Sequence, residues 1–177
     1  MTTTAKPEEI KALVLDVDGT LTDGRIGYCC GSTDSIKLFY CKDGLGITLL
    51  QSMGYQVGVL TGRGDKANRQ RCADLHITAI VEGCGDKAEG MLKVCEMMHV
   101  QPHECLYMGD DVNDLPAIRM AGLSAAPSDA VEEVKAAVNW VMKAQGGRGA
   151  VREAIETLLK KCNKWEETLA RYKGGVC

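Results

Sequence analysis

The chain has 177 residues, of which 45% are hydrophobic and 25% are charged, with a formal net charge of −3 at pH 7. This length and balance are typical of one folded domain with a sizeable core. The slight acidity argues against nucleic acid as the main partner, and the apolar runs are too short to span a membrane.

Strand-like apolar runs alternate with helix-like segments along the chain. The expected strands are 12–15, 56–60, 78–81, 104–108, 123–126 and 139–142. The expected helices are 44–53, 65–75, 86–99, 113–121, 129–137 and 150–161. This alternation predicts an α/β fold with a doubly wound, mostly parallel sheet in a single domain.

Two segments depart from the alternation. Residues 24–41 have strand-like ends around a polar turn with glycine, which predicts a small β-hairpin inserted after the first strand. Residues 162–177 end in KGGVC, and we expect a flexible tail there. The nine cysteines include no Cys-x-x-Cys pair, and the first residues lack the apolar stretch of a signal peptide. Reduced thiols and a cytoplasmic location are therefore expected.

Polar residues directly follow the first, second and fourth expected strands, and a lysine lies at the start of the helix expected after the third. Ligands gather at this edge of an open parallel sheet, so these side chains are expected to converge. In chain order they are Asp16, Asp18, Thr61, Lys87, Asp110, Asp111 and Asp114.

This set of groups suits phosphoryl transfer. Asp16 has the chemistry of a nucleophile that forms an aspartyl phosphate, and Asp18 could protonate the leaving alcohol and then deprotonate water. Thr61 and Lys87 would hold the phosphoryl oxygens.

Neighbouring carboxylates repel one another unless a cation lies between them, and ligation by oxygen alone favours Mg²⁺. Asp110 would complete the metal shell, with Asp111 and Asp114 as outer ligands.

The order of these motifs resembles the haloacid dehalogenase superfamily: Asp-x-Asp-Gly-Thr, then Thr after a strand, then Lys, then Gly-Asp-Asp-x-x-Asp. Longer stretches are similar to the 3-deoxy-D-manno-octulosonate 8-phosphate phosphatases, namely DVDGTLTDG, FYCKDGLGI, LTGR, GDKAEGM, YMGDDVNDLP and GGRGAVRE. The resemblance runs from about residue 10 to 160. It implies a capless Rossmann-like fold, Mg²⁺ dependence, a homotetramer and a role in making the eight-carbon sugar acid of lipopolysaccharide.

The resemblance also implies roles for individual residues. The implied catalytic residues are Asp16, Asp18, Thr61 and Lys87. The implied metal ligands are Asp16, the main-chain carbonyl of Asp18, and Asp110. The implied substrate contacts are Asp18, Tyr40, Cys41, Lys42, Asp43, Gly44, Gly62, Arg63, Arg71, Lys87 and Asn113.

Other readings of the sequence remain open. Related phosphatases act on nine-carbon ulosonate 9-phosphates, such as those of sialic acid or KDN, but they have Glu where this chain has Arg63. A phosphoacceptor signalling domain would lack an acid/base two residues after the acceptor, and an inactive assembly domain would show a decayed motif. Without a cap domain, the site is open to water unless a neighbouring subunit covers it. Isolated hairpins are also only marginally stable in water, so we expect this hairpin to pair with copies of itself in a tetramer. The GGRG loop is expected to reach a pocket, in its own chain or in the adjacent one, where Arg148 would meet the substrate carboxylate or phosphate.

Overall fold

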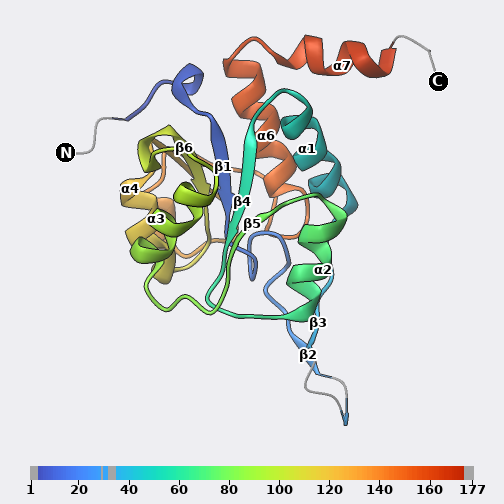
Figure 1. Cartoon of the computed structure of the whole chain (residues 1–177), viewed down its shortest axis with the longest axis vertical. Helices are drawn as coiled ribbons and strands as arrows, with labels where there is room; N and C mark the ends of the chain where they lie inside the picture. Colours follow the sequence, from blue (N-terminus) through green and yellow to red (C-terminus); the bar gives the residue numbers. More distant parts are fainter. Residues whose placement is uncertain (1–3, 29, 32–34, 174–177) are drawn as a thin grey trace.

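The computed structural model describes residues 4–28, 30–31 and 35–173. Its centre is a six-stranded sheet in the order β5-β4-β1-β6-β7-β8, in which neighbouring strands run parallel (Figure 1). The strands are β1 (Ala12–Leu15), β4 (Gln56–Leu60), β5 (Ala79–Val81), β6 (Cys105–Met108), β7 (Leu123–Ala126) and β8 (Trp140–Val141). The predicted parallel sheet is confirmed.

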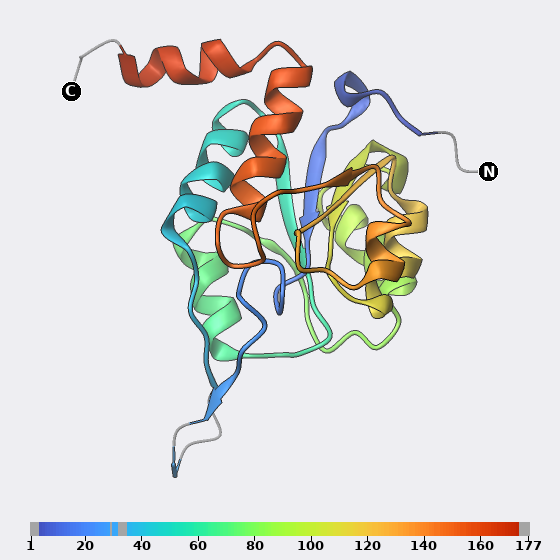
Figure 2. The same cartoon turned by 180° about the vertical axis from the view of Figure 1, so that it is seen from behind.

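Helices cover both faces of this sheet. They are α1 (Cys41–Ser52), α2 (Lys66–Asp74), α3 (Lys87–Met97), α4 (Leu115–Met120), α5 (Glu132–Lys135), α6 (Ala150–Lys161) and α7 (Trp165–Lys173). Short 3-10 turns occupy Pro7–Glu9, Pro102–Glu104 and Val112–Asp114. Figures 1 and 2 show α1, α2 and α6 on one face and α3 and α4 on the other. No helix in the described part of the chain is long and apolar enough to cross a membrane.

The central strand β1 supplies both hydrophobic cores. Leu13 and Leu15 belong to the core beneath α1, α2 and α6, whereas Ala12 and Val14 belong to the core beneath α3, α4 and α5. Successive side chains of a strand point to opposite faces, and all four residues are fully buried. Burial on both faces leaves only the end of this strand free to carry polar groups.

The predicted insertion is an antiparallel hairpin with strands of only two residues each, β2 (Gly27–Tyr28) and β3 (Ser35–Ile36). Its turn includes residues 29 and 32–34, which lie outside the described residues. The hairpin projects beyond the body at the end of the molecule where β1 ends (Figure 1). A cap domain would be inserted either after β1 or between β4 and α3. The described chain has only the hairpin in the first place and only α2 and β5 in the second, so neither place holds a second domain.

The C-terminal segment differs from the expected flexible tail. Residues 165–173 form α7, whose Thr168 is fully buried. The ring of Trp165 lies 5.5 Å from the guanidinium of Arg152 and 5.3 Å from the ammonium of Lys160, both on α6. These contacts hold the start of α7 against the body. Residues 174–177 lie outside the described residues.

Candidate active site

A cavity of about 540 Å³ opens beside the carboxyl ends of β1, β4 and β6. It is lined by Asp16, Asp18, Thr61, Gly62, Arg63, Asp110, Asp111, Val112 and Asn113. The strand ends predicted to converge therefore do so, because parallel strands present these ends along one edge of the sheet.

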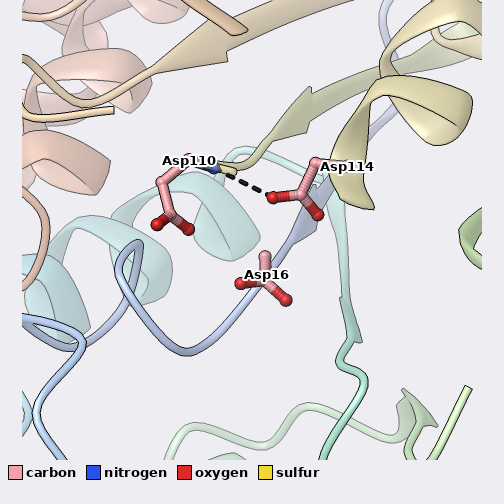
Figure 3. A group of neighbouring side chains, drawn as sticks. All are labelled: Asp16, Asp110 and Asp114. Atoms are coloured by element: carbon pink, nitrogen blue, oxygen red, sulfur yellow. Dashed lines mark hydrogen bonds between the residues drawn. The ribbon is translucent and has the colours of Figure 1, made fainter. Parts of the chain in front are cut away.

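Three carboxylates lie together at the floor of this cavity. Asp16, Asp110 and Asp114 each offer an oxygen within 4.8 Å of the others, and Figure 3 shows the three groups facing one another. Burial, reinforced by Asp114, raises the pKa of Asp16 to about 6. Burial, together with Asp16 and Asp114, raises the pKa of Asp110 to about 8. Three carboxylates buried so close together repel one another, and their oxygen atoms fit a hard divalent cation such as Mg²⁺.

Lys87, the first residue of α3, supplies the cation already present in the cluster. Its ammonium lies 2.5 Å from Oδ1 of Asp16 and 3.0 Å from Oδ1 of Asp114, and it donates to the carbonyl of Leu60 at 2.8 Å. Burial alone would lower the pKa of Lys87, but Asp16 and Asp114 outweigh burial and raise it. A charged lysine is therefore held against the proposed nucleophile.

Asp114 is fully buried, and both of its oxygens are engaged. Oδ1 accepts from the hydroxyl of Tyr107 at 2.6 Å, and Oδ2 accepts from the backbone N–H of Asp110 at 2.9 Å. Asp114 thus fixes Lys87 and the loop that bears Asp110. Tyr107 was not among the predicted site residues: a tyrosine in a buried strand needs a partner for its hydroxyl, but only the fold shows that this partner is Asp114.

The loop after β1 is shaped around Asp110. Gly19 has φ +95°, and a Cβ built there would lie 2.0 Å from Oδ2 of Asp110. The buried hydroxyl of Thr20 donates to Oδ1 of Asp110 at 3.3 Å. Position 19 therefore accepts only glycine. Thr20 contributes a hydrogen bond to Asp110 that was not predicted from the sequence.

Lys37, just beyond β3, was also missed. Its ammonium lies 2.6 Å from Oδ1 of Asp18. The two residues are far apart along the chain, and only the fold of the hairpin brings them together.

The residues predicted to contact substrate fall into two groups. Gly62, Arg63 and Asn113 line the cavity with Asp18, and Lys87 lies beneath it against Asp16. The others do not line it: Tyr40, Cys41, Lys42, Asp43, Gly44 and Arg71.

This second group lies where α1, α2 and α6 meet. Asp43 is 1% exposed, and its carboxylate accepts backbone N–H groups of Gly149 at 3.3 Å and Arg152 at 2.8 Å. Burial raises the pKa of Asp43, although these N–H groups oppose the rise. The guanidinium of Arg71 lies 5.6 Å from the centre of the Phe39 ring. Within one chain, Asp43 caps the start of α6.

The glycine-rich loop before α6 packs against the loop after β1. The N–H of Gly147 donates to the carbonyl of Thr20 at 3.0 Å, and a Cβ at Gly146 would lie 1.7 Å from the carbonyl oxygen of Gly19. The exposed Arg148 lies 3.5 Å from Asp23. The loop therefore packs beside the loop after β1, but Arg148 does not line the cavity, and its contact with substrate stays a prediction.

Comparisons with known proteins give a consistent picture. Residues 45–122 match the family model of haloacid dehalogenase-like hydrolases. The chain is 37% identical over 163 residues to the 3-deoxy-D-manno-octulosonate 8-phosphate phosphatase of Escherichia coli, covering 92% of this chain and 86% of that protein. It is 40% identical over 159 residues to the Haemophilus influenzae phosphatase of the same name, covering 90% and 88%.

Solved structures are similar throughout their length. The Moraxella catarrhalis 3-deoxy-D-manno-octulosonate 8-phosphate phosphatase, in complex with magnesium ion, phosphate ion and KDO, has a TM-score of 0.89 at 34% identity, with 94% of this chain and 95% of that chain covered. The cobalt-bound Haemophilus influenzae enzyme has a TM-score of 0.87 at 39% identity, with 91% and 94% covered.

Proposed function

The chain belongs to the family of 3-deoxy-D-manno-octulosonate 8-phosphate phosphatases, and we propose that it hydrolyses this eight-carbon sugar-acid phosphate to 3-deoxy-D-manno-octulosonate and phosphate. It is a phosphoric monoester hydrolase of the haloacid dehalogenase-like type. The observation that carries the proposal is the convergence of Asp16, Asp18, Thr61 and Asp110 on one cavity, with Lys87 against Asp16.

In the first step, the carboxylate of Asp16 attacks phosphorus, and the bond from phosphorus to the sugar oxygen breaks. Asp18, in its acid form, gives that oxygen a proton and so releases a neutral alcohol. Lys87 holds Oδ1 of Asp16 at 2.5 Å, which leaves the second oxygen for attack. Thr61 lines the cavity, and its hydroxyl would hold a phosphoryl oxygen.

In the second step, Asp18 takes a proton from water, and the hydroxide formed attacks the phosphorus of the aspartyl phosphate. The phosphorus–Asp16 bond breaks, and inorganic phosphate leaves. Because Asp18 regains its proton, the residues return to their starting states.

The cofactor is Mg²⁺, which the carboxylates of Asp16 and Asp110 and the main-chain carbonyl of Asp18 would hold. When bound, it neutralises the repulsion between these carboxylates and an anionic phosphate. The raised pKa values of Asp16 and Asp110 support this assignment, since burial and the neighbouring carboxylates make the charged forms unfavourable and a divalent cation would offset this.

Arg63, which lines the cavity, supports the eight-carbon substrate over nine-carbon ulosonate 9-phosphates, because the related nine-carbon phosphatases have Glu at this position. A phosphoacceptor signalling role or an inactive assembly role is disfavoured, since every group needed for turnover is present. The remaining implied contacts, Tyr40 to Gly44 and Arg71, do not line this cavity, and their contact with substrate stays a prediction.

A cytoplasmic homotetramer completes the proposal. The hairpin exposes Tyr28 by 77%, Ile36 by 53% and Leu38 by 77%, which is a large apolar surface for so small an element. Pairing of hairpins between subunits would bury this surface. Light scattering at micromolar concentration tests the assembly, and a fully active monomer would contradict it.

The decisive experiment compares phosphate release from the eight-carbon substrate, a nine-carbon ulosonate 9-phosphate and arabinose 5-phosphate. We expect the eight-carbon substrate to give the highest kcat/KM. Asp16→Asn should abolish turnover because an amide cannot form the acyl phosphate, and Asp18→Asn should lower it on the order of 100- to 10,000-fold. A higher kcat/KM for the nine-carbon compound, or full activity of Asp16→Asn, would overturn the assignment.

A further inference from the structure

Two lysines are buried among the residues that the structure describes, Lys87 and Lys37. The reaction steps above use only Lys87. Lys37 is 8% exposed and lies where the hairpin returns to the body, before α1 begins. A buried ammonium is costly unless an opposite charge compensates it, so its partner indicates its role.

That partner is Asp18. The Nζ atom of Lys37 lies 2.6 Å from Oδ1 of Asp18, with the two side chains 1% and 21% exposed. Both atoms are inaccessible to solvent, and within the described chain neither makes a hydrogen bond of good geometry. The ammonium therefore contacts only one oxygen of Asp18, and this contact can hold the carboxyl group in place while the other oxygen carries the proton to be transferred.

Lys37 contacts only one of the two carboxyl oxygens of Asp18, which leaves the other oxygen for proton transfer. Oδ1 is buried against Lys37, while the side chain as a whole lines the cavity. We propose that Lys37 is a positioning residue that holds the Asp18 carboxyl group so that its second oxygen faces the reacting oxygen atoms. This rests on the proposed function, because it assigns proton transfer to Asp18.

Two other roles for Lys37 predict different contacts. One alternative is that Lys37 only attaches the hairpin to the body. The hairpin already has such an attachment, because Ser35 donates a hydrogen bond to Asp65, which caps α2. If Lys37 bound the substrate, its ammonium would need access to solute, but the side chain is 1% exposed. A smaller cavity of about 250 Å³ is lined by Lys37 and Arg63, so the effect on KM must be measured as well.

The test uses the full-length enzyme with Mg²⁺ and steady-state kinetics on the eight-carbon substrate, with p-nitrophenyl phosphate as a generic ester. Lys37→Met keeps the length of the side chain and removes the charge. We expect kcat to fall on the order of 10- to 100-fold with KM unchanged, since a misplaced catalytic group costs about that much. Lys37→Arg, which keeps the charge, should restore much of kcat, and Ser35→Ala should leave kcat unchanged.

A double-mutant comparison tests whether Lys37 acts through Asp18. In an Asp18→Asn background, Lys37→Met should cost nothing further, because the carboxylate that it positions is already gone. An equal loss in both backgrounds would reject the proposal. So would an increase in KM alone, an equal loss from Ser35→Ala, or full activity of Lys37→Met.

Two controls keep these outcomes distinct. The wild-type enzyme is assayed first, and its failure to release phosphate from either ester would reject the proposed function. Thermal unfolding is recorded for each variant. Should Lys37→Met not fold, Lys37→Gln takes its place, with the same expected loss of kcat and the same rejecting outcomes.

Discussion

Asp43 offers a sharp test, because its position in one chain and its implied role in substrate binding predict different results. The carboxylate caps α6 through the N–H groups of Gly149 and Arg152, which are 106 and 109 residues further along the chain. Asp43→Ala removes both acceptors. If capping is its main role, the variant should lose stability while retaining affinity for substrate.

The expected size of the effect follows from the two hydrogen bonds. Loss of a side-chain cap costs about 1–2 kcal/mol of the free energy of unfolding. The charge adds little, because burial raises the pKa of Asp43 and so offsets the attraction of the helix N-terminus. For a domain of this size, each kcal/mol lowers the Tm by roughly 2–4 °C, so we expect a fall of about 2–8 °C.

The assay combines thermal unfolding with steady-state kinetics. Asp43→Asn keeps one acceptor oxygen and should lose less stability than Asp43→Ala. Asp74→Ala, at the exposed end of α2, is the matched control and should change the Tm little. An unchanged Tm for Asp43→Ala together with a many-fold rise in KM would refute the capping role and favour contact with the substrate of a neighbouring subunit.

Two further predictions concern the centre of the site. Tyr107→Phe removes a buried hydroxyl that donates to the carboxylate of Asp114, and it should lower the free energy of unfolding by about 1.5–3 kcal/mol in denaturant titrations, whereas the exposed Tyr172→Phe should change nothing. Equal stability of these two variants would contradict the geometry around Asp114. Chelation of divalent cations should abolish activity and lower the Tm, because Mg²⁺ no longer separates the carboxylates, and added Mg²⁺ should restore both. Ca²⁺ should restore the Tm without activity, since its coordination is looser and its bonds are longer. Full activity in excess chelator would contradict the metal assignment.

The elements that could be predicted from sequence were those specified by local pattern. The strand predicted at 56–60 and the helix predicted at 150–161 have the observed bounds of β4 and α6, because their apolar residues recur with the period of each structure. The start of α1 was missed: it begins at Cys41 and not at 44. Tyr40 makes no side-chain capping bond there, so no local signal marks the boundary.

The convergence at the cavity could also be predicted, because it depends only on strand order and strand ends. The partners of Asp18 and Asp43 could not. Lys37 reaches Asp18 through the hairpin, and Asp43 meets α6 through tertiary packing. Tyr107 was missed for the same reason, since a buried tyrosine shows its hydroxyl partner only once β6 stands beside the turn that carries Asp114.

The contacts of Lys87 limit which parts of this enzyme can change during evolution without disturbing the reacting groups. One ammonium joins the carbonyl of Leu60 at the end of β4, Asp16 after β1 and the hydroxyl of Tyr107 on β6, at 2.8, 2.5 and 3.3 Å. The three strands are thereby tied at the edge where the reaction occurs, and the reacting groups share the stiffness of the sheet. New substrates are therefore more accessible through mutations in the hairpin before Lys37 and at Arg63 in the loop after β4, which make none of these contacts with Lys87.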